Sequence, residues 1–313
     1  MRRCFALLIA LAALLSGCAS QERTPSASGA APAESAPSPA ESGSAPADAP
    51  GMIQSVAGSY PAPDLTGLPL LNSAQDLAEL TPVDFGVMEQ EYETRYDSYL
   101  LLEGTELENT VYVLRGQEDG ASIYIVSGVH GDELAGWYAG TLLRRATVKA
   151  GAVYILAPAN RYGAENDQRR TRDDRDLNRN FPGGANGCEA EQIAASIFDD
   201  IADKEPDLVL DLHEGILHAD GRDNLGNSII CADIISIGDL IFDLIQTSQE
   251  GVLTTRPLDI YSSPPSGSLN ETVTARLGIP VITAETFREE SLTARVLGQL
   301  RLAQHILEWY GLR

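Results

Sequence analysis

The sequence predicts one α/β domain built on a mostly parallel sheet, with helices covering both faces of that sheet. Short runs of the chain are apolar without alternating, which is typical of strands buried on both faces. Between them lie segments whose apolar residues recur at i, i+3 and i+4, the spacing of an amphipathic helix. Strands alternating with helices along the chain favour parallel pairing. We expect strands at residues 123–126, 153–156, 208–212, 228–230 and 281–283, and helices at residues 134–147, 189–202, 238–248, 271–277 and 292–310.

Residues 1–17 have the features of a lipoprotein signal peptide. Two arginines follow Met1, and the next apolar run is shorter than the about 20 residues that a membrane-spanning helix needs. The run ends in Leu-Ser-Gly-Cys, which resembles a bacterial lipobox with Cys18 as the lipidated residue. The alternative is an ordinary secretory signal followed by a chance cysteine. We expect a protein of the bacterial cell envelope, anchored by lipid on the extracytoplasmic side of the membrane.

Residues 18–62 are expected to form a disordered tether. This stretch is rich in Ala, Ser and Pro and has almost no large apolar residues, so it cannot bury enough surface to offset the entropy lost on ordering. The remaining residues, 63–313, are numerous enough for a single catalytic domain with a sizeable core.

The formal net charge of the chain is −23. Nucleic acids and anionic lipid surfaces attract basic proteins, so this charge argues against nucleic-acid binding and against electrostatic attachment to a membrane. Against this background, Arg169, Arg170, Arg172, Arg175 and Arg179 form a local basic cluster. We interpret the cluster as a site for an anionic substrate; the alternative is a solvated loop.

The domain contains two cysteines, Cys188 and Cys231. An oxidising compartment permits a disulfide between them if their Cα atoms come within about 7 Å. Cys231 lies in an apolar run, so the alternative for it is an ordinary buried thiol.

Three residues at expected strand ends have the chemistry of a zinc site. His130 and Glu133 follow the strand at 123–126, and His213 ends the run at 208–212. The carboxyl ends of parallel strands meet at one edge of a sheet, which is where α/β proteins bind ligands. Two imidazoles and one carboxylate leave one tetrahedral position open, as in catalytic zinc sites. The alternative is a His and a Glu that only cap or solvate a helix.

Glu285 lies at the end of another expected strand. A carboxylate at that edge can act as a general base toward water held by the metal. The alternative is a strand-end glutamate that faces solvent.

The most specific segment is residues 176–182, Asp-Leu-Asn-Arg-Asn-Phe-Pro. The planar fork of Arg179 suits a carboxylate, and Asn178 can donate to the same anion. This segment, the earlier His-Gly-Asp-Glu, the later His213 and the late Glu285 occur in an order that resembles the zinc metallocarboxypeptidases and their relatives, the succinylglutamate desuccinylase and aspartoacylase deacylases. The resemblance covers roughly residues 90 to 313.

This resemblance implies a zinc carboxypeptidase-like fold and one zinc ion per chain, held by His130, Glu133 and His213. It makes Glu285 the general base and implies that Asp176 orients His130.

The resemblance also implies two substrate contacts, because Asn178 and Arg179 would hold the carboxylate of the substrate. The family places an arginine before this segment to stabilise the oxyanion. Four arginines are available here, and we favour Arg172, with Arg170 next.

Two further residues would form the pocket for the C-terminal side chain. In the carboxypeptidases a tyrosine closes over the substrate and a nearby position forms the pocket floor, which here would be Tyr261 and Leu269. The spacing departs by about two residues from the family pattern, and the alternative for Tyr261 is an ordinary half-buried loop aromatic. An uncharged floor predicts preference for small or apolar C-terminal residues.

Together these features predict a lipid-anchored zinc-dependent hydrolase that removes C-terminal residues from peptides. One alternative is an N-acyl-amino-acid deacylase of the succinylglutamate desuccinylase/aspartoacylase type. Another, from a different class, is a non-catalytic lipoprotein that binds peptides or zinc.

Overall fold

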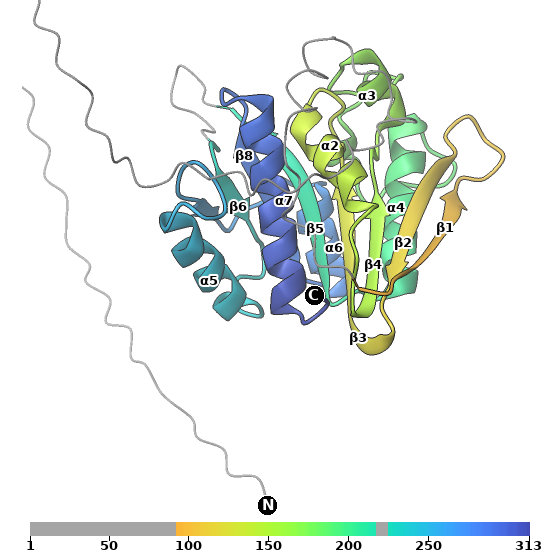
Figure 1. The fold of residues 1–313 in the computed structure, drawn as a ribbon. Coiled ribbons are helices and arrows are strands. Elements are labelled where there is room, and N and C mark those ends of the chain that lie inside the picture. Colours follow the sequence, from red (N-terminus) through yellow and green to blue (C-terminus); the bar gives the residue numbers. More distant parts are fainter. Residues whose placement is uncertain (1–91, 217–224) are drawn as a thin grey trace, which may run out of the picture. The chain divides into compact units, whose positions relative to one another are not determined.

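One eight-stranded sheet organises the fold, with strand order β1-β2-β4-β3-β5-β8-β6-β7 (Figure 1). The computed structural model describes residues 92–216 and 225–313. The predicted signal peptide at 1–17, the lipidation site Cys18, the tether at 18–62 and the domain start at 63 therefore lie outside the described residues. Within the described ranges, no helix has the length and apolar character needed to cross a membrane.

The centre of the sheet is parallel, as expected. It consists of β4 (Ala150–Leu156), β3 (Glu118–Ser127), β5 (Leu208–Gly215) and β8 (Val281–Phe287), and each of these strands is parallel to its neighbour in that order. Every residue of β5 and β8 is buried. This explains why these strands are apolar runs without alternation.

Both edges of the sheet include antiparallel pairs. On one side, β1 (Arg95–Leu101) and β2 (Asn109–Arg115) form a hairpin that adds to β4. On the other side, β6 (Ser228–Ile230) is antiparallel to β8, and β7 (Asp259–Tyr261) pairs with β6. The sequence analysis predicted β6 but not β1, β2 or β7. The strands β1 and β7 are largely exposed and contain polar residues, so they lack the apolar run on which that prediction depended.

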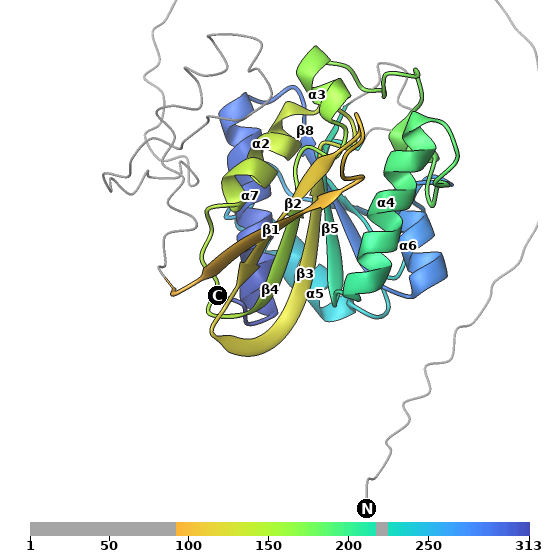
Figure 2. The same cartoon turned by 90° about the vertical axis from the view of Figure 1, so that its right-hand side faces the viewer.

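Helices cover both faces of the sheet, which confirms the predicted layers (Figures 1 and 2). One core cluster includes buried residues of α2 (Leu134–Leu143), α5 (Gly238–Gln249) and α7 (Leu292–Trp309). A second cluster includes buried residues of α4 (Glu189–Lys204) and α6 (Leu269–Leu277). The short helix α3 (Arg161–Asn166) and the 3-10 turn η2 (Leu177–Arg179) were not predicted.

Local capping contacts determine where several helices begin. The Ser268 side chain accepts from Glu271 N at the start of α6, and Ser291 does the same for Ala294 N at the start of α7. Cys188 caps α4, and its backbone N–H donates to Glu191 Oε2 at 2.8 Å. Cys188 and Cys231 are both free thiols in this structure, so the disulfide that the sequence left open is not formed.

The sheet topology fixes where a site can form. The strands β3, β5 and β8 are adjacent and parallel, so their carboxyl ends meet at one edge, where His130, His213 and Glu285 are placed. In the β5–β8 pairing His213 lies directly opposite Glu285. A difference of one residue in that register would direct one of the two side chains to the other face of the sheet.

Candidate metal and active site

The turn between β3 and α2 presents His130 and Glu133. Backbone bonds from Ala159 N to Ser127 O and from Asn160 N to Gly128 O hold this turn against the loop that follows β4. Gly128 has a φ of 68°, in the left-handed region that favours glycine. Glu133 directly precedes α2, and both His130 and Glu133 are buried.

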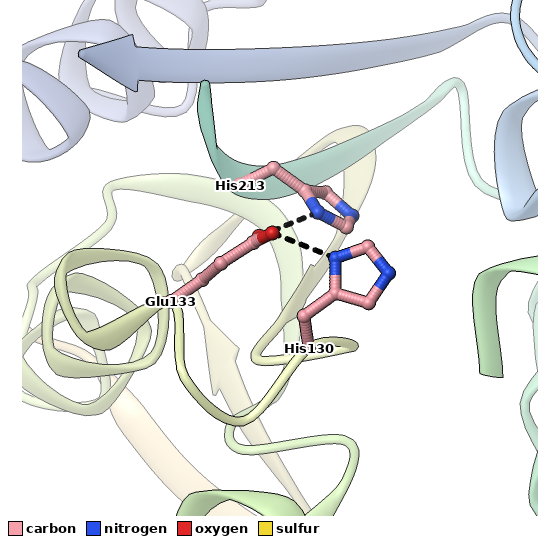
Figure 3. Close-up of side chains that lie close together, drawn as sticks. All are labelled: His130, Glu133 and His213. Carbon is pink, nitrogen blue, oxygen red and sulfur yellow. Dashed lines mark hydrogen bonds and ion pairs between the residues drawn. The ribbon is translucent and has the colours of Figure 1, made fainter. Parts of the chain in front are cut away.

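The imidazoles of His130 and His213 converge on the carboxylate of Glu133 (Figure 3). His130 Nδ1 lies 2.7 Å from Glu133 Oε1, and His213 Nδ1 lies 2.7 Å from Glu133 Oε2. The two imidazole rings have centroids 4.8 Å apart. All three side chains are at most 5% exposed. The structure thus brings together the three residues that the sequence proposed as metal ligands.

The outward nitrogen of each imidazole faces a second carboxylate. His130 Nε2 lies 3.1 Å from Asp176 Oδ1, which is the contact predicted for Asp176. His213 Nε2 lies 3.0 Å from Asp211 Oδ1, although this approach lacks hydrogen-bond geometry. Carboxylates in these positions fix the orientation of histidines that bind metals and increase their basicity.

This donor set fits a zinc ion. Two Nδ1 atoms and a carboxylate are grouped within 4.8 Å of one another, in a buried place with carboxylates on the far side of both rings. Nitrogen and oxygen donors in this number match a catalytic zinc site, whose fourth position is open to water or substrate. Burial alone would raise the pKa of Glu133, but the neighbouring His130 and His213 outweigh it and hold that pKa well below its usual range.

Glu285 stands beside the cluster, on the strand that pairs with β5. Its side chain shares a sheet face with that of His213, because the two residues are opposite in register. Glu285 is 5% exposed, and its Oε2 has no hydrogen-bond partner among the residues that the structure describes. Burial raises the pKa of Glu285 to about 7, although the nearby His213 opposes the shift. A buried carboxyl with one oxygen free of hydrogen bonds and with such a pKa has the properties of a general base.

The turn η2 places the predicted substrate contacts next to the metal cluster. Asp176 accepts from Asn178 N at 3.0 Å, so the carboxylate that orients His130 also shapes this turn. Asn178 is buried, and its Oδ1 accepts from Leu269 N at 2.9 Å. Arg179 is exposed, and its Nη1 donates to Asn178 O at 2.6 Å. Among the described residues the guanidinium of Arg179 forms no direct ion pair, although its charge is among those that hold the pKa of Asp176 below its usual range.

The structure does not bring Arg172 to the cluster, which corrects the preference stated from the sequence. Arg172 Nη1 bonds Glu106 Oε2 at 2.9 Å, and the guanidinium lies 5.4 Å from the centre of the Tyr162 ring. Arg172 lines a small cavity with residues of α3 and α4, and none of the three metal-binding candidates lines that cavity. The charge of Arg172 is therefore paired with Glu106 at this outer surface.

Arg169 occupies the position that was expected for Arg172. Its Nη1 lies 3.3 Å from Glu133 Oε1, and its Nη2 lies 3.1 Å from Asp176 Oδ2. The side chain remains 42% exposed, so it faces both the cluster and solvent. Arg170, the second choice, pairs with Asp174 on the exposed surface.

The structure also differs from the prediction for the specificity pocket. Leu269 is fully buried in the core cluster that includes α4 and α6, so it cannot form the floor of an open pocket. The expected preference for apolar C-terminal residues therefore loses its basis. Tyr261 is 38% exposed on β7, which is the edge strand and is separated from β8 by β6.

The sequence analysis missed several polar residues around the cluster. Asp211 lies two residues before His213 on β5, so strand alternation places both on one face and could have identified it. Glu214, Arg288, Arg295 and Gln299 also pack near the cluster. Arg288 directly follows β8, Arg295 and Gln299 lie in α7, and no local pattern links these three residues to His213.

Comparisons with known proteins agree with this geometry. Residues 119–222, about a third of the chain, match the family model of the succinylglutamate desuccinylase/aspartoacylase catalytic domain. The matched segment contains the three metal-binding candidates and η2, whereas Glu285 lies beyond it. No curated protein sequence matches the chain.

Solved structures share the fold. A succinylglutamate desuccinylase/aspartoacylase from Rhodobacter sphaeroides is 19% identical with a TM-score of 0.51, covering 74% of this chain and 68% of that one. An aspartoacylase family protein from Mesorhizobium loti is 22% identical with a TM-score of 0.52, covering 74% and 70%. The D,L-carboxypeptidase Csd4 from Helicobacter pylori, bound to mDAP, is 17% identical with a TM-score of 0.54, covering 62% and 52%. The family-model match and the shared fold agree with the resemblance stated from the sequence.

The metal site and the base can be separated by mutation. His213→Ala should lose metal and turnover together, because two remaining protein ligands hold zinc too weakly. Glu285→Gln should keep metal near one equivalent but lose turnover, because an amide cannot accept a proton from water. Metal content by elemental analysis and hydrolysis rates of the same samples test both. Full metal in His213→Ala, or unchanged rates in Glu285→Gln, would contradict the assignment.

Proposed function

We propose that this chain, a relative of the succinylglutamate desuccinylase/aspartoacylase and carboxypeptidase hydrolases, is a zinc-dependent hydrolase that removes C-terminal residues from peptides. The observation that carries the proposal is a single edge of the sheet with a buried His-Glu-His cluster, a buried Glu285 whose Oε2 has no hydrogen-bond partner among the described residues, and an exposed Arg179. Metal ligands, a base and an anion-binding group are the components that cleavage of an amide bond next to a carboxylate requires.

Each component has a chemical task. A zinc ion held by His130, Glu133 and His213 would supply polarisation of the scissile carbonyl and a bound water with its pKa lowered to about 7. Glu285 then accepts a proton from the attacking water and can return it to the leaving amine. Arg179 and the amide of Asn178 hold the carboxylate of the substrate and so fix the scissile bond next to Glu285.

Arg169 is the residue that we propose for the oxyanion. Charge develops on the carbonyl oxygen as water attacks, and a fixed cation near that oxygen stabilises the transition state more than the ground state. Arg169 is the arginine of the basic cluster that contacts Glu133, whereas Arg172 and Arg170 are paired elsewhere. Its side chain is 42% exposed and is therefore accessible to a substrate.

The second candidate function is N-acyl-amino-acid deacylation. The same metal, base and carboxylate contacts serve that reaction, because an N-acyl amino acid also has an amide bond next to a carboxylate. The match to the desuccinylase/aspartoacylase catalytic domain favours this alternative, and the similarity to a D,L-carboxypeptidase favours the first. A non-catalytic binding lipoprotein is the least supported function, since binding alone does not require a buried Glu285 whose Oε2 lacks a hydrogen-bond partner among the described residues.

The oxyanion assignment leads to a comparison of two arginines. Arg169→Gln should lower kcat by about 100-fold or more, the loss seen when one oxyanion donor is removed. Arg172→Gln should stay within about threefold, because that side chain pairs with Glu106 away from the cluster. Metal content must be measured in both variants, since Arg169 also contacts Glu133. The reverse ranking at equal metal content would restore Arg172 to the site.

A substrate panel distinguishes the two reactions. If Arg179 grips a terminal carboxylate, amidating the peptide leaves that guanidinium without its partner, and cleavage should fall at least about tenfold. The purified, zinc-loaded protein is assayed against free peptides, their amides and N-acyl amino acids. Equal turnover of free and amidated peptides would end the carboxypeptidase proposal. Turnover of N-acyl amino acids with no peptide cleavage would identify the deacylase.

The location of the enzyme is a further proposal, based on the sequence alone. Cys18 after the apolar segment supports a lipid anchor that holds the enzyme on the extracytoplasmic side of the membrane, in the bacterial cell envelope. Cys18→Ser should move the protein from the detergent phase to the aqueous phase in a partitioning assay. Partitioning that does not change would mean that Cys18 is not lipidated.

A further inference from the structure

A buried ion pair lies behind the metal cluster, on the opposite side of β5 from His213. Neighbouring residues on a strand point to opposite faces, so His213 faces the cluster while the next residue, Glu214, faces α7. There Glu214 pairs with Arg295, which is close to the start of α7. The Glu214 side chain is 0% exposed and that of Arg295 is 12% exposed. The reaction proposed above does not use this pair.

Glu214 contacts the metal-binding segment at two points. Its backbone N–H donates to Glu133 Oε2 at 3.1 Å, the same oxygen that lies 2.7 Å from His213 Nδ1. Its side-chain Oε2 accepts from Ala135 N at 3.2 Å, at the start of α2. Glu214 thus holds the Glu133 carboxylate and also the helix start that Glu133 precedes.

The helix α7 contacts the other metal ligand as well. Gln299 lies one turn after Arg295, and its Nε2 donates to His213 O at 2.7 Å and to Thr286 Oγ1 at 2.9 Å. Arg295 and Gln299 therefore connect one helix to two consecutive residues of β5, of which one is a ligand and the other supports Glu133. A movement of α7 would displace both.

A third contact secures the same turn. Arg288, directly after β8, donates through Nη1 to Asp132 Oδ2 at 3.1 Å and through Nη2 to Asp132 O at 2.9 Å. These bonds restrain the residue before Glu133. The turn is consequently held by Glu214 of β5 and by Arg288 at the end of β8, and α7 supports it through its contacts with β5.

Stability alone is a poor explanation for this arrangement. A buried ion pair loses much of its attraction to desolvation, and apolar side chains of similar size often fold as well or better. Here an apolar pair would also remove the negative acceptor at Ala135 N. A ligand carboxylate that binds metal requires fixed geometry, and outer contacts commonly supply it.

We propose that Glu214 and Arg295 are positioning residues that dock the metal-binding segment on α7 and thereby increase its affinity for zinc. Arg295 fixes the Glu214 side chain, Glu214 fixes Glu133 and the start of α2, and Gln299 fixes the backbone of His213. The inference rests on the proposed function only through the metal site, and it requires no particular substrate.

The test measures zinc affinity rather than turnover. Competition with a chromophoric chelator gives the affinity of the full chain and of the variants Glu214→Gln, Arg295→Met and Glu214→Gln/Arg295→Met. The double variant leaves no unpaired charge, so it carries the test if either single variant does not fold. Zinc affinity should fall about 10- to 100-fold in the double variant, the range seen when outer contacts of a metal site are removed. Circular dichroism and thermal unfolding of the metal-free proteins verify that the variants are folded.

Asp243→Asn is the matched control. Asp243 of α5 forms an ion pair with His305 of α7, so this variant breaks another contact of the same helix and should leave zinc affinity unchanged. A folded double variant that binds zinc within about twofold of the unaltered chain would overturn the proposal. Zinc binding without hydrolysis of any substrate would overturn only the proposed function. A failure of the unaltered chain to bind zinc would overturn the metal site and this inference with it.

Discussion

The arrangement of the site depends on the contacts that the Glu133 carboxylate makes. Its two oxygens receive His130 and Arg169 on one side and His213 and the Glu214 N–H on the other. A buried carboxylate is very unfavourable without such partners, and these partners come from separate parts of the chain. Each must therefore be brought to the same point by the fold. The strands, turns and helices around the site bring these partners to the Glu133 carboxylate.

The parallel centre of the sheet supplies this convergence. Because β3, β5 and β8 are adjacent and run the same way, the residues that follow or end them gather at one edge. The register that pairs His213 with Glu285 places a base next to a ligand, on the same face. Burial raises the pKa of Glu285 to about 7, within the range that suits a base near neutral pH.

Charge is distributed unevenly over this acidic chain. With a formal net charge of −23, most guanidinium groups near the site find a carboxylate. Arg169 pairs with Asp176 and Glu133, Arg170 with Asp174, and Arg172 with Glu106. Arg179 lies in the turn that Asp176 caps and forms no direct ion pair among the described residues, although its charge helps to lower the pKa of Asp176. An anionic substrate would supply the missing partner, which is why the proposed reactions both involve a carboxylate.

The sequence by itself determined the central strands, the helical layers and the positions of His130, Glu133, His213 and Glu285. These follow from local patterns, since apolar runs mark buried strands and polar residues at their ends mark the sheet edge. Only the tertiary structure decided whether Arg169 or Arg172 contacts the cluster. It also placed Leu269 in the core and brought Arg295 of α7 to Glu214. Neighbouring arginines in one loop have the same local sequence signal, and their partners lie up to 66 residues away. The direction of such side chains depends on which distant elements pack against the loop, and that information is absent from any short stretch of the chain.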